Sequence, residues 1–267
     1  MTSPLPGHGF TELIRPHTGA IIGARATEAG HTSDVTAVVD GTAGRFFVKA
    51  VRNRPGGRLE SLAREGAINP FVQPISPRVL WRADNDDWVV LGFEFVQGRH
   101  ADITPGSPDL PHLVDVLNGI AALPLPEIAA NWPETRWDHH TGRPGLFRGD
   151  ALLYTDVHPS NILIGDQAAW AVDWAWPTRG AAFIDPALLV LQLVVAGVPP
   201  GEAEGLASGC TAWCDTDPEA VDAFAVANTR MYAAASARDP GASWLTAMAT
   251  AASAWAAHRG VDHRASV

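Results

Sequence analysis

The chain has 267 residues, of which 46% are hydrophobic and 18% are charged. This composition excludes an intrinsically disordered protein and is enough for one large domain, or for two lobes that share a cleft. The net charge is −10, and no stretch is a dense run of Lys or Arg, so we do not expect a nucleic-acid partner. An acidic protein of this kind suits a cationic small molecule better.

The sequence shows no signal for export or for membrane insertion. Residues 1–16 lack the apolar core of a signal peptide, and the longest apolar stretch, 187–198, is too short to cross a bilayer. Cys210 and Cys214 lie four residues apart on an expected helix, which is poor geometry for a mutual disulfide. We therefore expect a cytoplasmic protein with reduced cysteines and no membrane partner.

The first part of the chain, residues 1–98, is predicted to consist mostly of strands. Apolar runs on either side of a Gly-rich turn at 40–44 indicate a β-hairpin, and apolar residues at helical spacing follow it. The expected elements, in order, are strands 36–39 and 45–51, a helix over 58–71, and strands 79–81 and 88–96.

The second part of the chain is predicted to be mainly helical, so we place a domain boundary after residue 96. Residues 1–96 would form an N-terminal lobe and residues 97–267 a C-terminal lobe. The expected elements are a helix over 110–123, an irregular stretch over 124–150, two short strands within 152–174, and helices over 186–198, 201–214, 218–235 and 243–258.

Lys49 is the sole lysine among 19 basic residues, and it lies in the apolar strand 45–51. In a chain that otherwise uses Arg, charge alone does not explain a lysine at this position. A compact ammonium group differs from the planar guanidinium in what it can bind, so the residue points to a specific chemical need.

Three polar residues near the middle of the chain have the spacing of a phosphoryl-transfer site. Asp156 and Asn161 lie in a polar loop between two apolar runs, and Asp173 ends the next apolar strand. A kinase needs one carboxylate for the acceptor hydroxyl, and an Asn and a second carboxylate as oxygen ligands of Mg²⁺. Each residue alone could be a turn or capping residue. The three together favour phosphoryl transfer.

This segment resembles the catalytic and metal-binding motifs of the aminoglycoside phosphotransferase family, which are small-molecule kinases with a protein-kinase-like fold. The family pattern His-Gly-Asp-x-His-x-x-Asn matches residues 154–161, its Asp-Trp matches Asp173-Trp174, and its Asp-Pro matches Asp185-Pro186. Tyr154 and Thr155 replace the usual His and Gly, so the loop must be braced in a different way.

The resemblance implies an α+β, bilobal fold with a small antiparallel-sheet N-lobe and a larger helical C-lobe. It also implies ATP and Mg²⁺ as cofactors in the cleft, with Asp156 as the base and with Asn161 and Asp173 as metal ligands. Lys49 would bind the nucleotide phosphates. Glu65 is its expected ion-pair partner, in preference to Glu60.

Two further segments resemble the nucleotide-binding parts of the family. The turn at 30–34, which contains Gly30 and Ser33, is similar to the loop that covers the phosphates. Residues 93–98 are similar to the hinge, where backbone groups of Glu94 and Val96 would bind adenine. No Gly-Lys-Ser/Thr sequence occurs, which excludes a Walker-type P-loop.

The sequence thus predicts transfer of the γ-phosphoryl group of ATP to a hydroxyl of a small molecule. The resemblance implies that the acceptor is an antibiotic or a related amino or sugar metabolite. Two alternatives remain open at this point. The Tyr154-Thr155 departure is compatible with a nucleotide-binding protein that has lost catalysis. A metal-dependent hydrolase could instead use a cluster of imidazoles and carboxylates. That cluster would comprise His139, His140, Asp156, His158 and Asp173.

Two groups of residues are candidates for the acceptor side, although each also has an ordinary structural interpretation. Trp132 and Trp137 lie in the irregular stretch and could line a pocket, or could pack in the core. An acidic stretch could face a cationic acceptor, or could be the solvated start of a helix. It comprises Asp215, Asp217, Glu219 and Asp222. The sequence does not indicate an oligomeric state.

Overall fold

The computed structural model describes residues 4–27 and 33–261. The chain divides into two compact units. One unit contains residues 1–99 together with 165–176, and the other contains residues 100–164 together with 177–267. The segment that carries Asp173 therefore groups with the N-terminal residues, whereas the sequence suggests a single boundary after residue 96. An antiparallel sheet in the first unit and helices in the second confirm the predicted α+β class.

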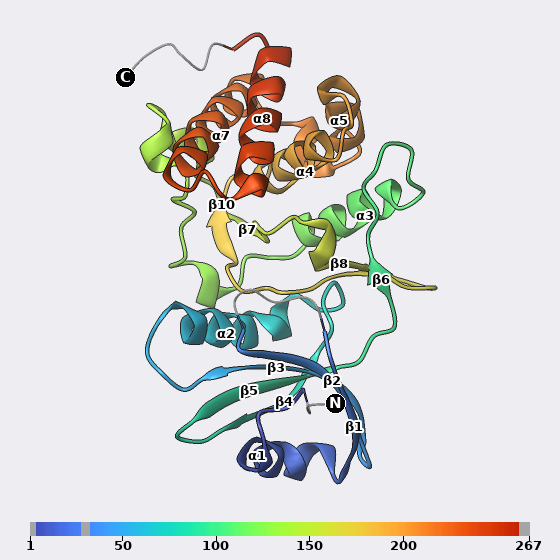
Figure 1. The fold of residues 1–267 in the computed structure, drawn as a ribbon. Coiled ribbons are helices and arrows are strands. Elements are labelled where there is room, and N and C mark those ends of the chain that lie inside the picture. Colours follow the sequence, from blue (N-terminus) through green and yellow to red (C-terminus); the bar gives the residue numbers. More distant parts are fainter. Residues whose placement is uncertain (1–3, 28–32, 262–267) are drawn as a thin grey trace. The chain divides into compact units, whose positions relative to one another are not determined.

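The first unit is built on a five-stranded antiparallel sheet (Figure 1). Its strand order is β1-β2-β3-β5-β4, so β3 is central, and β2 and β3 form the predicted hairpin. The strands are β1 (Ile21–Ala26), β2 (Val35–Gly41), β3 (Gly44–Arg52), β4 (Val79–Asp84) and β5 (Trp88–Glu94).

Two helices, α1 (His8–Thr18) and α2 (Gly57–Ile68), cover opposite faces of this sheet (Figure 1). Because side chains alternate along a strand, β3 supplies residues to both faces. Val48 packs in one apolar cluster with Phe10 of α1, and Val51 packs in another with Leu62 of α2. Lys49 lies two residues before Val51 on this strand, so both side chains are on the face that α2 covers.

Helix α1 and strand β1 are absent from the sequence prediction, which gives strands from residue 36 onward. Phe10 and Ile14 of α1 are buried and lie four residues apart, so the helix has an apolar stripe only one turn long. Pro16 lies within its last turn, where a missing backbone N–H normally argues against a helix. Packing against the sheet outweighs this local signal.

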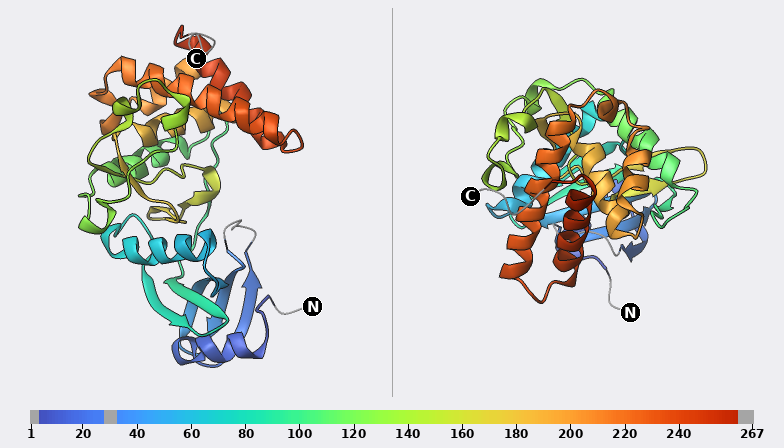
Figure 2. Two further views of the ribbon diagram at one scale, coloured as in Figure 1. Left: turned by 90° about the vertical axis from the view of Figure 1, so that its left-hand side faces the viewer. Right: turned by 90° about the horizontal axis from the view of Figure 1, so that it is seen from above.

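The second unit is mainly helical (Figures 1 and 2). Its helices are α3 (Leu110–Ala121), α4 (Ile184–Val195), α5 (Pro200–Ala207), α6 (Thr211–Cys214), α7 (Pro218–Arg238) and α8 (Ser243–His258). The single helix predicted over 201–214 is wrong, because the chain breaks between α5 and α6. Within residues 4–27 and 33–261, no helix is both long enough and apolar enough to cross a bilayer.

Short elements occur in both units, and some of them carry the polar loop of the second unit. Strand β7 (Ala151–Leu153) pairs antiparallel with β10 (Thr178–Gly180). Strands β6 (Arg99–His100), β8 (Ile162–Ile164) and β9 (Ala169–Ala171) lie near the points where the chain crosses between the units. The 3₁₀ turns are η1 (Asn69–Phe71), η2 (Glu127–Ala129), η3 (Asp138–His140), η4 (Pro144–Phe147) and η5 (Pro159–Asn161).

An aromatic cluster fills the core of the second unit, where α7 packs along α8 (Figure 2). Trp137 is 1% exposed, its ring centroid lies 4.6 Å from that of Phe224, and its indole N–H donates to Asn228 at 3.1 Å. Trp137 is therefore a core residue and not a pocket wall. The sequence also predicts that Trp244 and Trp255 lie on core faces of α8. Trp255 is buried, but Trp244 is 62% exposed, so the prediction for Trp244 is wrong.

Candidate active site

A buried ion cluster in the first unit contains three of the predicted site residues. The Lys49 ammonium on β3 lies 2.6 Å from a carboxylate oxygen of Glu65 on α2 and 2.6 Å from Oδ1 of Asp173. The side chains of Lys49 and Glu65 are 4% and 5% exposed. Glu60, on the same helix, is exposed. Glu65 is therefore the carboxylate of α2 that pairs with Lys49.

The charges in this cluster oppose the effect of burial. Burial alone would lower the pKa of Lys49, but the nearby charges of Glu65 and Asp173 raise it above its ordinary value. Burial raises the pKa of Glu65, and Asp173 adds to this, although Lys49 opposes both. Each buried ion costs several kcal/mol of desolvation, so such a cluster contributes little net stability and is better explained by a chemical role.

Asp173 reaches Lys49 from a tight turn that follows β9. Its backbone has φ of +60°, a left-handed conformation that Asp adopts more readily than most residues. The turn is fixed on both sides. The Ala171 N–H donates to the Ile75 carbonyl at 2.9 Å, and the Trp174 indole N–H donates to the Ala171 carbonyl at 3.1 Å.

The second unit carries Asp156, exposed in the loop that follows β7, and Asn161 at the end of η5. The side-chain amide nitrogen of Asn161 donates to the Asp156 carbonyl at 3.3 Å, which assigns the other end of the amide as oxygen. Nδ1 of His158 accepts from the Ser160 N–H at 3.2 Å and so caps η5. His158 thus braces the loop.

The donor atoms of Asn161 and Asp173 are of the kind that Mg²⁺ prefers. Both side chains present oxygens, and Mg²⁺ is held in proteins by a few carboxylate or carbonyl oxygens together with substrate phosphates. The amide of Asn161 is oriented through its nitrogen, and Asp173 is oriented through Lys49. The residues present therefore fit this ion.

The hydrolase alternative requires a different arrangement. Within the part of the chain that the structure describes, no group of three or more His, Cys, Asp or Glu residues lies together as a metal site. His158 uses Nδ1 for its cap, and His139 is exposed. Within the second unit, His139, His140, Asp156 and His158 therefore do not form a metal site.

Tyr154 and Thr155, which depart from the family motif, are anchored to a buried carboxylate. The N–H groups of both residues donate to Asp185, each at 2.8 Å. The Tyr154 hydroxyl donates to the Asn161 carbonyl at 3.3 Å, so the side chain, 1% exposed, spans the loop from one end to the other.

Asp185 lies in the first turn of α4, where the helix N-terminus favours a negative charge. Burial nevertheless raises the pKa of Asp185 to about 6, against the effect of the two amide hydrogen bonds. From the sequence, Asp185 is expected to open this helix. Its role as the acceptor for the loop has no separate sequence signal.

Arg136 is a second residue that sequence reasoning missed. Its guanidinium donates to the Thr155 carbonyl at 3.3 Å and to the Thr155 hydroxyl at 3.2 Å. Arg136 lies 19 residues before the loop, in a stretch without regular periodicity, so no motif could have indicated it. The bracing that the sequence required is thus supplied by Asp185, Arg136 and Tyr154.

Comparisons with solved structures show that the chain has a known fold. The structure is similar to that of choline kinase LicA from Streptococcus pneumoniae, with a TM-score of 0.65 and 10% sequence identity. The alignment covers 93% of this chain and 97% of that one. It is also similar to the macrolide 2'-phosphotransferase MphH from Brachybacterium faecium, with a TM-score of 0.54 and 15% identity. This alignment covers 91% of this chain and 97% of that one. The chain has the protein-kinase-like fold of the small-molecule phosphotransferases.

A third structure of this fold is a thermostable mutant of the aminoglycoside phosphotransferase APH(4)-Ia in ternary complex with AMP-PNP and hygromycin B. The TM-score is 0.56 at 11% identity, over 92% of this chain and 99% of that one. No protein-family profile and no curated protein sequence matches the chain. At these identities the likeness shows the fold, and the predicted fold is confirmed.

The expected nucleotide contacts of this phosphotransferase fold lie in the first unit. Gly30 falls outside the described residues, and Ser33 is half-buried just before β2. Glu94 ends β5, and its N–H donates to the Arg78 carbonyl at 2.8 Å while its carboxylate accepts from the Arg78 N–H at 2.9 Å. Val96 follows in a segment without regular structure. The adenine-binding roles of Glu94 and Val96 stay predictions.

The acidic stretch before and within α7 is engaged in structural contacts. Asp217 caps α7 by accepting from the Glu219 N–H at 2.9 Å. Glu219 pairs with Arg143, and Asp222 pairs with Arg259. These contacts favour the interpretation of the stretch as a helix start over that of an acceptor site.

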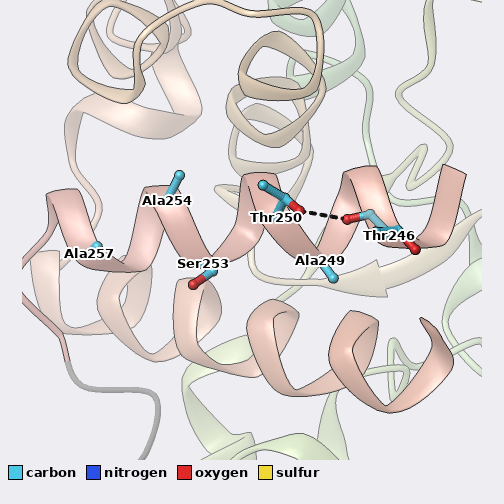
Figure 3. Close-up of a pocket in the computed structure, with 6 residues that line it drawn as sticks. All are labelled: Thr246, Ala249, Thr250, Ser253, Ala254 and Ala257. Carbon is cyan, nitrogen blue, oxygen red and sulfur yellow. Dashed lines mark hydrogen bonds between the residues drawn. The ribbon is translucent and has the colours of Figure 1, made fainter. Parts of the chain in front are cut away.

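A pocket on α8 is formed by small side chains on one face of that helix (Figure 3). Its lining residues are Thr246, Ala249, Thr250, Ser253, Ala254 and Ala257. None of these side chains is a carboxylate or an imidazole, so this pocket offers no general base for phosphoryl transfer.

Proposed function

We propose that the chain is an ATP-dependent phosphotransferase that moves the γ-phosphoryl group to a hydroxyl of a small molecule. The observation that carries this proposal is the buried Lys49 between Glu65 and Asp173. In protein kinases, a strand lysine paired with a helix glutamate and an aspartate that holds Mg²⁺ must both be in place for phosphoryl transfer. The fold of the chain supports the same interpretation.

Each residue of the proposed site has a distinct task. Lys49 binds the nucleotide phosphates, and Glu65 keeps the ammonium in position. Asn161 and Asp173 would hold Mg²⁺, which when bound neutralises charge on the phosphates. Asp156 orients the acceptor hydroxyl, whose oxygen forms a bond to the γ-phosphorus as the bond to the ADP oxygen breaks. Asp156 takes the hydroxyl proton late in this displacement, because the transition state is largely dissociative.

The nucleotide and acceptor classes follow from the predicted site together with the comparisons. Glu94 and Val96 would bind adenine, and the turn with Gly30 and Ser33 would cover the phosphates. The AMP-PNP and AMP complexes of two solved structures support an adenine nucleotide. The names choline kinase and macrolide phosphotransferase support a small hydroxyl-bearing acceptor, an antibiotic or an amino or sugar metabolite. The net charge of −10 favours a cationic acceptor. A reaction that consumes ATP would take place in the cytoplasm, which is the location we propose.

Loss of catalysis is the second candidate, and the loop geometry argues against it. A degenerate loop would be expected to lose its restraints along with its motif. Here both N–H groups of the replaced Tyr154-Thr155 pair are bound by Asp185, and Thr155 is also bound by Arg136. These restraints on the replaced residues support a working catalytic loop.

The experiment that tests the proposal incubates the purified chain with Mg-ATP and panels of antibiotics, amino alcohols and sugars. Mass spectrometry then detects any compound that gains the mass of one phosphoryl group. Glu65→Gln should abolish the product, and Glu60→Gln on the exposed side of the same helix should retain it. Conversion of a compound without ATP, or failure of wild type to bind Mg-ATP in calorimetry, would overturn the proposal.

A further inference from the structure

The residue immediately before Asp156 has an unusual backbone. Thr155 has φ of +61° and is 3% exposed. This left-handed region is rare for residues other than Gly, Asn and Asp, and it is a genuine outlier for a β-branched side chain. Such a conformation persists only when surrounding contacts impose it, so neighbouring residues must hold Thr155 in place.

Arg136 binds Thr155 at two points. One guanidinium nitrogen donates to the Thr155 carbonyl at 3.3 Å, and the other donates to the Thr155 hydroxyl at 3.2 Å. The Thr155 N–H is bound by Asp185 at 2.8 Å. The planar fork of an arginine can bind two acceptors at a fixed separation. Together, Arg136 and Asp185 engage the carbonyl, the N–H and the side chain of this residue.

Arg136 is itself held by a buried carboxylate. Its backbone N–H donates to Glu134 at 2.7 Å, and its guanidinium lies 3.9 Å from the other Glu134 oxygen, which also accepts from Thr178 at 3.0 Å. Glu134 is 3% exposed, and the guanidinium lies 5.0 Å from the ring centroid of Trp137. These contacts orient the guanidinium of Arg136 toward Thr155.

We propose that Arg136 is a positioning residue that holds Thr155 in its left-handed conformation and thereby sets the direction of Asp156. This inference rests on the proposed role of Asp156 as the base. The resembled motif has Gly at this position, and Gly adopts positive φ without steric cost. Arg136 supplies from outside the loop what Gly would supply from within it, and this explains how a threonine is tolerated next to the base.

The test crosses Arg136→Ala with two substitutions of Thr155. Alone, Arg136→Ala should lower kcat by at least about tenfold through misplacement of Asp156. The KM for ATP should change by less than about twofold, because the proposed phosphate-binding residues Lys49 and Asp173 are unaltered. In the Thr155→Gly background, the loss caused by Arg136→Ala should shrink to less than about threefold. In the Thr155→Ala background the Cβ remains, so the loss should stay at about tenfold or more.

Arg148 offers a matched control. Its side chain is 40% exposed, as against 39% for Arg136, and it donates to the Glu134 carbonyl at 2.7 Å. Arg148→Ala should have the same effect in the wild-type and Thr155→Gly backgrounds. Arg136→Lys keeps a cation beside Glu134 and so preserves folding, but a single ammonium replaces the fork. It should lower kcat in the same direction as Arg136→Ala.

A stability measurement makes the inference independent of the acceptor. Arg136→Ala should lower Tm at least about twice as much in the wild-type background as in the Thr155→Gly background, because the second protein has no strained threonine to hold. If this coupling is found but no phosphorylated product forms, the positioning role stands and the proposed function fails. If the product forms but Arg136→Ala acts equally in both backgrounds, the positioning role is overturned and the proposed function stands.

Discussion

Replacing Lys49 with Met tests the buried ion cluster most severely. The substitution keeps a chain of similar length and removes the ammonium that lies 2.6 Å from both Glu65 and Asp173. Glu65 then keeps its burial and the nearby charge of Asp173, but loses the favourable charge of Lys49. Removing one partner of a buried pair costs about 3–5 kcal/mol, because the other charge is left uncompensated. We expect Lys49→Met to lose about that amount at pH 8.

The loss should depend on pH with a definite sign. The pKa of Glu65 is already raised from 4.5 by burial, and without Lys49 it must rise further. A carboxyl whose folded pKa exceeds its unfolded pKa prefers the folded state when protonated, so its contribution falls as pH rises between the two values. The deficit of Lys49→Met should therefore be smaller at pH 5 than at pH 8, and each unit of further pKa shift contributes about 1.4 kcal/mol.

Urea unfolding of wild type and Lys49→Met at both pH values provides the measurement. Adding Glu65→Gln to Lys49→Met removes the buried charge and should recover most of the lost stability. Adding Glu60→Gln, an exposed carboxylate on the same helix, should recover none. A deficit below about 1 kcal/mol that does not change with pH would refute the argument that removal of Lys49 leaves a buried charge uncompensated.

Three other predictions concern Asp156, Asp173 and Asp185. Asp156→Asn should lower kcat by about 10²-fold or more with ATP affinity nearly unchanged; loss of ATP binding in calorimetry would instead assign Asp156 to the metal or to the structure. Asp173→Ala should abolish Mg-nucleotide-dependent turnover while circular dichroism shows a folded protein, and retained turnover would remove Asp173 from the site. The stability of wild type relative to Asp185→Asn should fall by up to about 3 kcal/mol as pH rises from 4 to 7, because burial raises the pKa of Asp185 from 3.8 to about 6. A relative stability that rises with pH would show that the amide hydrogen bonds dominate over burial.

The fold and the ion cluster were largely predictable, because strong local signals and short motifs carry them. A nearly continuous run of apolar residues marks β3, and the sole lysine stands out against the arginine-rich composition. The helix that carries Glu65 is predicted by apolar residues at helical spacing. These features depend on residues close together in sequence, and the aminoglycoside phosphotransferase motif supplies the long-range link to Asp173.

The sequence predictions fail where tertiary packing outweighs local preference. Helix α1 has one buried turn and an internal Pro16, and the sheet stabilises it after the chain has folded. The sequence predicts core positions for both Trp244 and Trp255, yet only Trp255 is buried, because helical periodicity does not say which face of a helix meets a neighbour. The break between α5 and α6 contains Gly209, a residue type that commonly follows the end of a helix, and this local signal is absent from the sequence prediction.

Arg136 lies beyond the reach of sequence reasoning for a different reason. Its function depends on a contact with Thr155 across 19 residues, within an irregular stretch where neither period nor motif applies. The sequence shows only that Thr155 departs from the family Gly and that some other restraint must exist. The structure identifies that restraint as Arg136 together with Asp185.

The most direct test of the central claim measures two products in one reaction. With an acceptor from the screen, ADP and the phosphorylated acceptor are quantified over time for wild type and for Asp173→Ala. The account predicts that the two products form in equal amounts in wild type and that both disappear in Asp173→Ala. ADP formed without phosphorylated acceptor, or acceptor converted when ATP is omitted, would contradict it.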